Sequence, residues 1–198
     1  MSTAAVYAAN VELDIDTHLA RWRPFVQWML AIPHLVLTQV LNTLRCALTV
    51  VSLVAVVFTK RIPRSVFDAI AMTYRYEWRT VSYALFLHDD YPPFDFTPAA
   101  HDDGQQPSGR LTIEYPDTLN RWKPLYKWLL AVPHYAVCLA LAVASLVTVL
   151  AGAVAVLATG RYPERARRFL VATYRYGLRV QAYVGLLTDQ YPPFRLAA

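Results

Sequence analysis

Four arginines and two tyrosines at helical spacing are the residues of this sequence best suited to bind an anion. They are Arg75, Arg79 and Tyr83 and, 100 positions later, Arg175, Arg179 and Tyr183. Side chains four residues apart lie on one face of a helix, where like charges repel unless an anion or an acidic side chain lies between them. The stripes therefore predict either a site for anionic lipid headgroups or an internal network of salt bridges and tyrosines.

Two histidines, His34 and His134, each follow a proline at the start of a long apolar run. A symmetric pair at a membrane surface could bind a metal ion or carry protons. Metal binding needs three or four ligands, and no cluster of histidine, cysteine and carboxylate accompanies these residues in the sequence. We expect both histidines to cap hydrogen-bond networks, and we expect no metal or other cofactor.

A polar stripe follows the first apolar run at steps of three and four residues. Its members are His34, Thr38, Asn42, Arg45, Thr49 and Ser52. The equivalent residues of the second run are mostly small (His134, Cys138, Ala142, Ser145, Val149, Gly152), which suits close helix packing. We expect the first stripe to face protein and to mark where another subunit or a ligand docks, and we expect Arg45 to need a partner.

The elements that position these residues belong to one unit that occurs twice. Thr73-Tyr74-Arg75-Tyr76 returns at residues 173–176, and each copy closes on Tyr-Pro-Pro-Phe, at residues 91–94 and 191–194. A gap-free register of this length indicates duplication of one structural unit. The sequence predicts repeat 1 over residues 1–94, a linker over 95–110 and repeat 2 over 111–198.

Each repeat contains an apolar run of 25 residues, 34–58 and 134–158. As a helix, such a run is about 37 Å long and can cross a hydrocarbon core of about 30 Å. Charged residues make up 17% of the chain, below the roughly 25% of soluble proteins. The net charge of +5 is spread over apolar segments and segment ends, which argues against nucleic-acid binding. We predict an all-α integral membrane protein of the cytoplasmic membrane.

Three further features flank each apolar run. Trp22, Trp28, Trp122 and Trp128, with nearby cations, are typical of interfacial anchors. Alternating residues at 11–15 and 111–115 predict two short extramembrane strands that could pair with each other. Pro24 and Pro124 suit helix starts, Pro33 and Pro133 a kink or restart, and Gly160 a helix C-cap.

A second helix is expected after each turn, over residues 64–88 and 164–188. Its arginines oppose membrane crossing, whereas its length and its one-sided polarity permit it. We favour crossing over an interfacial helix, which gives four spans and parallel repeats about an axis along the membrane normal. One span per repeat would instead make the second repeat inverted. The orientation in the membrane stays open.

The pattern R-W-x-P, W-x-L-A-x-P-H, T-x-R-x-P and Y-P-P-F, present in both repeats, resembles a bacterial membrane-protein family of unknown function that is widespread in actinobacteria. The resemblance covers nearly the whole chain, and the Tyr-Pro-Pro-Phe endings are its most specific element. Repeat 1 departs from the pattern at Ser82 and His88, where repeat 2 has Ala182 and Thr188. The resemblance implies a multi-pass membrane protein and supplies no reaction.

These features favour a non-enzymatic accessory or scaffolding subunit of a larger envelope assembly, such as one that transports lipids, with membrane lipids and other membrane subunits as partners. The alternative is a small homo-oligomeric channel or carrier for anionic lipids or anions. A third hypothesis is a membrane enzyme that acts on lipid through His34 or His134. No catalytic residues are expected, because the sequence contains no nucleophile elbow, phosphate loop, zinc signature or paired catalytic carboxylates.

Overall fold

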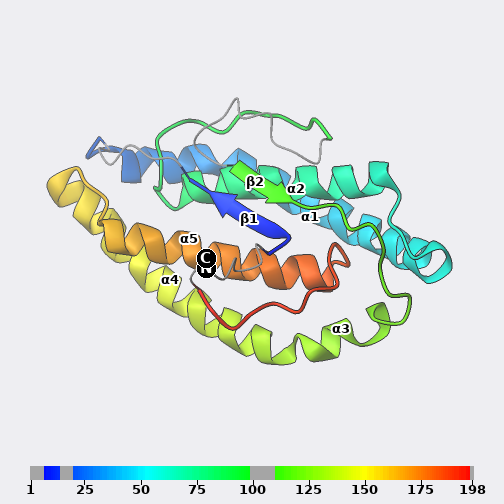
Figure 1. Cartoon of the computed structure of the whole chain (residues 1–198). Helices are drawn as coiled ribbons and strands as arrows, with labels where there is room; N and C mark the ends of the chain where they lie inside the picture. The colour runs from blue at the N-terminus through cyan, green and yellow to red at the C-terminus, as the bar shows by residue number, and fades with distance from the viewer. Residues whose placement is uncertain (1–6, 14–19, 99–109, 197–198) are drawn as a thin grey trace, which may run out of the picture.

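The computed structural model describes residues 7–13, 20–98 and 110–196, which form five helices and two strands. Repeat 1 comprises β1 (Ala9–Glu12), α1 (Arg23–Thr59) and α2 (Arg64–Ala84). Repeat 2 comprises β2 (Arg110–Ile113), α3 (Pro124–Leu130), α4 (Val132–Thr159) and α5 (Glu164–Val184). In Figure 1 the strands lie across α2 and α5, and the long helices α1 and α4 lie behind and beside them.

Proline and a left-handed residue delimit the helices as the sequence predicts. Pro24 and Pro124 stand in the first turns of α1 and α3, where a missing N–H costs nothing. Pro33 lies inside the continuous helix α1. In repeat 2, by contrast, the helix is interrupted at Ala131, between α3 and α4. Gly160 caps α4 with φ 72°, as predicted, and Lys60 caps α1 with φ 59°.

The helices after the turns end earlier than the sequence suggests, at Ala84 and Val184 instead of near residues 88 and 188. Phe86 and Leu186 have φ values of 60° and 67°, in the left-handed region that ends a helix. The amide of Leu87 donates to the carbonyl of Ser82 at 3.0 Å, which satisfies part of the helix end.

The predicted strands form and pair with each other, which confirms that expectation. β1 and β2 are antiparallel, and the register opposes Val11 to Leu111, its own equivalent in the other repeat. The pairs on either side, Asn10 with Thr112 and Glu12 with Arg110, are symmetric about this centre. A local two-fold axis therefore passes between Val11 and Leu111, perpendicular to the sheet, and relates the two repeats. Residues 14 and 15 of the predicted first strand are outside the described residues.

Each strand of the sheet packs on a helix of the other repeat. β1 of repeat 1 packs on α5 of repeat 2, and β2 of repeat 2 packs on α2 of repeat 1. Beneath the sheet, the rings of Trp78 and Tyr174 stack across the boundary with centroids 4.4 Å apart. One hydrophobic core includes Val11, Leu111 and Trp78 and continues through both repeats. The repeats are thus one interlocked unit.

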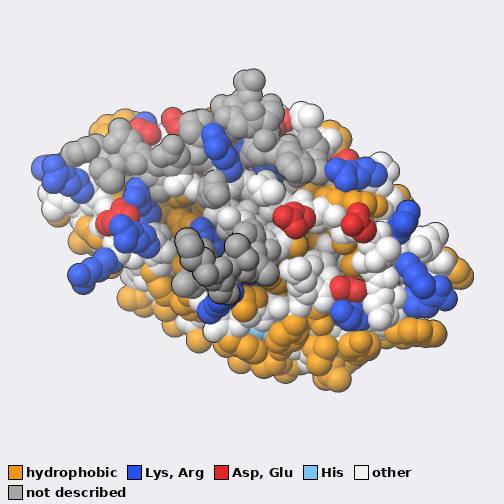
Figure 2. Space-filling model, viewed as in Figure 1, with side chains coloured by type: hydrophobic (Ala, Val, Ile, Leu, Met, Phe, Trp, Pro, Cys, Tyr) orange, Lys and Arg blue, Asp and Glu red, His pale blue; other side chains and the backbone are white. Residues whose placement is uncertain are grey.

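Helices α1 and α4 expose most of their apolar surface. Both are long and apolar enough to cross a membrane, and among the described residues they are the two helices that are. Their exposed side chains include Phe25, Val36, Val40, Leu44, Val54 and Phe58 on α1, and Leu139, Val143, Leu146, Val147, Leu150 and Val154 on α4. Figure 2 shows hydrophobic side chains in a band along the edge formed by α3 and α4, with charged side chains scattered over the rest of the visible face.

The expectation of four spans therefore needs correction, because two of the described helices are candidate spans. α2 and α5 direct their apolar side chains into the core and are not candidate spans. Figure 1 shows that α1 and α4 run in opposite directions, as a two-fold axis perpendicular to the helices requires. The sequence argument treated the apolar residues of α2 and α5 as facing lipid, whereas the protein itself covers them.

Candidate functional site

The signature motifs of repeat 1 converge on His34. Its Nδ1 is 2.6 Å from the hydroxyl of Tyr76 on α2, and its ring stacks on Phe94 at a centroid distance of 4.4 Å. Tyr91 packs edge-on against the same ring at 4.7 Å. The Pro-His, Thr-Tyr-Arg-Tyr and Tyr-Pro-Pro-Phe segments thus meet at one histidine, which fastens the tail of the repeat to its helix pair.

Repeat 2 builds the same cluster with the same geometry. His134 Nδ1 is 2.6 Å from the hydroxyl of Tyr176, and the ring stacks on Phe194 at 4.1 Å and contacts Tyr191 at 4.9 Å. Both histidines are fully buried, and Nε2 of each has no hydrogen-bond partner among the described residues. The described residues contain no group of three metal-ligating side chains. Each histidine therefore takes part in a hydrogen bond, as the sequence suggested, and in an aromatic cluster that the sequence did not suggest.

A second repeated site anchors the loop that follows α2 or α5. In repeat 2 the Lys127 ammonium, 1% exposed, donates to the carbonyl of Thr188 at 2.7 Å and pairs with Asp189 at 2.8 Å. Burial lowers the pKa of Lys127, and the neighbouring Asp189 opposes this shift. In repeat 1 the amide of Gln27 makes the equivalent contacts, donating to the carbonyls of Tyr83 at 2.8 Å and His88 at 2.7 Å.

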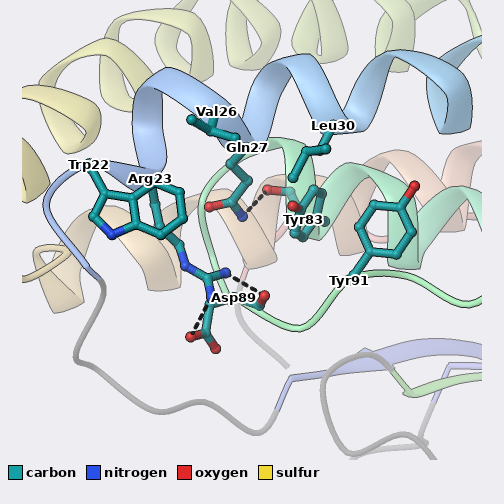
Figure 3. A pocket seen from close by; sticks show the side chains of 8 residues that line it. All are labelled: Trp22, Arg23, Val26, Gln27, Leu30, Tyr83, Asp89 and Tyr91. Atoms are coloured by element: carbon teal, nitrogen blue, oxygen red, sulfur yellow. Dashed lines mark hydrogen bonds and ion pairs between the residues drawn. The ribbon is translucent and has the colours of Figure 1, made fainter.

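Next to Gln27 is a pocket of about 300 Å³, shown in Figure 3. Trp22 and Leu30 line it beside Tyr83 and Tyr91, and an ion pair of 3.2 Å between Arg23 and Asp89 closes one side. Aromatic and aliphatic walls with one ion pair suit an apolar group that carries a polar end. Trp22, Trp28, Trp122 and Trp128 are all more than half exposed, which is compatible with the predicted anchoring role.

The predicted arginine-tyrosine stripes separate into different sites. Tyr83 lines the pocket of Figure 3, and Tyr183 packs beneath Lys127, whose Nζ is 4.9 Å from the ring centroid. Arg79 instead pairs with Asp95 of the tail at 3.2 Å. The tyrosines are therefore not part of one ligand set with the arginines, because the arginine side chains extend toward the tail and the sheet.

In repeat 2 the arginines meet the N-terminal segment. Arg175 Nη2 donates to the carbonyl of Val11 at 2.9 Å, and the Arg179 guanidinium lies over the ring of Tyr7 at 5.6 Å. In the part of the chain that the structure describes, no carboxylate forms an ion pair with either arginine. The two repeats thus treat matching arginines differently.

The polar stripe of α1 faces inward, as predicted, and Arg45 has a partner. Its guanidinium pairs with Glu77 of α2 at 2.6 Å, donates a hydrogen bond to Asn42 Oδ1 at 2.8 Å and lies 4.0 Å from the centroid of the Tyr74 ring. Ser52 and His34 are buried at the two ends of the stripe. The stripe therefore packs mainly on its own repeat, which leaves little of it for docking a partner.

A cavity of about 380 Å³ adjoins Arg45, between the repeats. Asn42, Arg45 and Thr49 line one wall, and Tyr135 and Gln181 of repeat 2 line the other. This part of the stripe could contact a small ligand. Sequence reasoning missed Glu77, although a position-by-position comparison of the repeats points to it, since Arg45 and Glu77 are replaced together by Ser145 and Gly177.

The two departures of repeat 1 from its motif also form one contact. Ser82 Oγ is 2.9 Å from His88 Nε2, and both residues are buried. Repeat 2 replaces both at once, with Ala182 and Thr188. The two residues that depart from the motif therefore contact each other and are replaced together in repeat 2.

Comparison with known families identifies both repeats. A family described as a domain of unknown function (DUF4389) matches residues 21–95 and again residues 121–195. The chain belongs to this family. Each matched DUF4389 segment starts one residue before Trp22 or Trp122 and ends one residue after the Tyr-Pro-Pro-Phe motif, so it contains the whole histidine cluster and excludes the strand. No curated protein and no solved structure matches the chain.

Proposed function

We propose that this protein is a non-enzymatic accessory module of a membrane assembly, held in lipid by the exposed apolar faces of α1 and α4. The observation that carries the proposal is the two-sidedness of the molecule. Apolar side chains of α1 and α4 are exposed over the length of both helices, whereas charged side chains are scattered over the rest of the visible face, which forms the polar surface. Burying such an apolar surface in lipid is strongly favourable, at about 25 cal/mol for each Å².

The polar surface constrains how the module sits in the membrane. The sheet is located near the middle of the long helices (Figure 1). If α1 and α4 crossed the bilayer upright, the open edges of β1 and β2 would be at the level of the hydrocarbon core, where unsatisfied backbone groups cost several kcal/mol each. An upright module therefore needs a protein partner over its sheet.

A flat arrangement avoids this cost. With α1 and α4 in the plane of one leaflet, the two-fold axis lies along the membrane normal and the sheet faces water. It also accommodates α1, whose 37 residues extend about 55 Å, well beyond the hydrocarbon thickness. We therefore favour in-plane embedding, with the polar surface presented to other subunits, those of a lipid-transport assembly in the cell envelope.

Spin-label depth measurements distinguish the two arrangements. Single cysteines at Val36, Leu44 and Val54, with Cys46 and Cys138 changed to alanine, would be labelled and compared for accessibility to oxygen and to a polar relaxation agent in liposomes. In-plane embedding predicts similar depths at the three sites. A label at Leu44 that lies much deeper in the bilayer than the labels at Val36 and Val54 would establish crossing. A protein that stays folded and dispersed without detergent would contradict both arrangements.

Native mass spectrometry after mild detergent extraction tests the accessory role. Foreign subunits at fixed stoichiometry are expected. A homo-oligomer without other subunits would favour the alternative, a small channel or carrier, for which the cavity beside Arg45 is the supporting observation. A monomer that turns over lipid would instead favour an enzyme.

A further inference from the structure

Repeat 1 neutralises its own buried arginine. Arg79 is 4% exposed, and Asp95, the residue that follows Tyr-Pro-Pro-Phe, pairs with it at 3.2 Å. Hydrogen bonds from the Thr97 hydroxyl and amide, together with the Arg79 guanidinium, lower the pKa of the Asp95 carboxyl and keep it ionised. The tail of repeat 1 thus supplies the anion that its arginine requires.

Repeat 2 has the opposite charge at that position. The residue after its Tyr-Pro-Pro-Phe is Arg195, which is exposed. The equivalent of Arg79 is Arg179, which is 6% exposed, so the guanidinium is as buried as in repeat 1. Replacement of the acid by a base removes the counter-ion and adds a cation.

The surroundings of Arg179 leave its charge unbalanced. Tyr7 fixes the N-terminal segment against repeat 2, because its hydroxyl donates to the carbonyls of Arg179 at 3.2 Å and Gln190 at 2.9 Å. Nε of Arg179 and Nε of Arg175 are buried without a hydrogen-bond partner among the described residues. Burial and the positive charges of Arg175 and Arg195 lower the pKa of the Arg179 guanidinium, and the described residues contribute no carboxylate to offset them.

An unpaired buried cation is strongly destabilising, so a protein normally supplies an anion beside it. We propose that repeat 2 binds a phosphoryl group between Arg175, Arg179 and Arg195, in the place that the Asp95 carboxylate takes in repeat 1. A phosphate carries up to two negative charges and several acceptor oxygens, which match the planar donor forks of arginine. The repeats thus differ in function: repeat 1 is closed by its own tail, and repeat 2 is open to a ligand. This inference does not depend on the proposed accessory role.

The shared chemistry is that of a phosphate monoester or diester, either free or as a lipid headgroup. Two arms separate these sources. In the first, thermal unfolding in mild detergent is followed with inorganic phosphate at constant ionic strength. In the second, binding is measured to vesicles of neutral phospholipid with and without phosphatidic acid. A response to inorganic phosphate alone assigns a soluble ligand, a response to phosphatidic acid alone assigns a headgroup, and no response in either arm overturns the proposal.

The decisive variant is Arg195→Asp, which restores the residue of repeat 1. It should raise the unfolding temperature without ligand and weaken phosphoryl binding by about tenfold or more, because an internal carboxylate then occupies the site. Arg165→Asp is the matched control, since Arg165 is exposed on α5 and undergoes the same change of charge. Arg195→Gln gives a second measure if the aspartate variant folds poorly. Equal binding by Arg195→Asp and Arg165→Asp would show that only net charge matters and would overturn the site.

Discussion

Arg45 on α1 and Glu77 on α2 form an ion pair of 2.6 Å inside repeat 1, and repeat 2 has neither residue. The equivalent positions are Ser145 and Gly177, so the acid and the base are exchanged together. Such paired exchange shows that the two copies keep the same helix packing with different interior chemistry. The residues of each copy also suggest the substitutions with which the other copy can be tested.

Removal of one member of this pair should be much more harmful than removal of both. Glu77→Ala leaves the Arg45 guanidinium buried without its carboxylate and should lower the free energy of unfolding by about 3 kcal/mol. Arg45→Ser combined with Glu77→Ala should recover most of that loss. Chemical unfolding of the wild type, the two single variants and the double variant in mild detergent measures the coupling. Additive effects would show that the pair is not energetically coupled.

Gly152 and Tyr162 form a second compensated pair. A Cβ atom at residue 152 would lie 2.2 Å from the Tyr162 ring, a distance at which atoms overlap. Gly152→Ser should therefore destabilise the protein by about 1–3 kcal/mol through overpacking. Repeat 1 has Ser52 and Ile62 at these positions, so adding Tyr162→Ile should relieve the cost. Thermal unfolding of the single and double variants tests this, and a single variant as stable as wild type would contradict it.

The Ser82–His88 contact should make stability depend on pH. Burial lowers the pKa of His88, so the folded state holds a neutral imidazole while the unfolded chain takes up a proton below about pH 6.5. Stability is therefore complete above that pH and falls as the pH drops toward the lower folded-state pKa. The unfolding temperature of wild type should decrease between about pH 7 and 5.

The control for this pH effect is the pair found in repeat 2. Ser82→Ala with His88→Thr removes the titrating group and should flatten the pH dependence, although the two remaining buried histidines keep part of it. If the unfolding temperatures of wild type and the double variant changed equally with pH, His88 would be excluded as a source of the effect.

The hydroxyl of Tyr176 should contribute measurably to the free energy of unfolding. Tyr176→Phe leaves Nδ1 of the buried His134 without its partner at 2.6 Å and should cost about 1–2 kcal/mol. Tyr126→Phe is the control, because Tyr126 is 43% exposed. Chemical unfolding measures both, and equal effects would mean that the hydrogen bond contributes little.

Sequence patterns predicted those features that depend on local chemistry. Alternation located the strands, Gly160 located a helix end, and spacing placed His34 and Ser52 on an inward-facing stripe. Each of these follows from backbone geometry within a few residues. The duplication that the recurring motifs indicated agrees with the match of one family to both copies.

Features that depend on distant contacts were beyond such reasoning. The apolar residues of α2, such as Phe67 and Ile70, suit lipid or a core equally, and only the tertiary fold shows that they face the core. Tyr83 follows Arg79 by one helical turn, yet the long arginine side chain extends to Asp95 and separates the two. Pro33 and Pro133 have nearly identical flanks, but the helix is continuous at one and broken at the other.

The exchanged strands have a consequence for any chain that carries a single copy of this unit. Because Val11 opposes its own counterpart Leu111, one copy alone exposes a strand edge and a helix face that only an identical neighbour can complete. Two separate chains could assemble in the same way as a homodimer, with the same rotational symmetry. The tandem gene then fuses what would otherwise be two subunits, and this covalent fusion allows Asp95 and Arg195 to differ, which no symmetric dimer of identical chains permits.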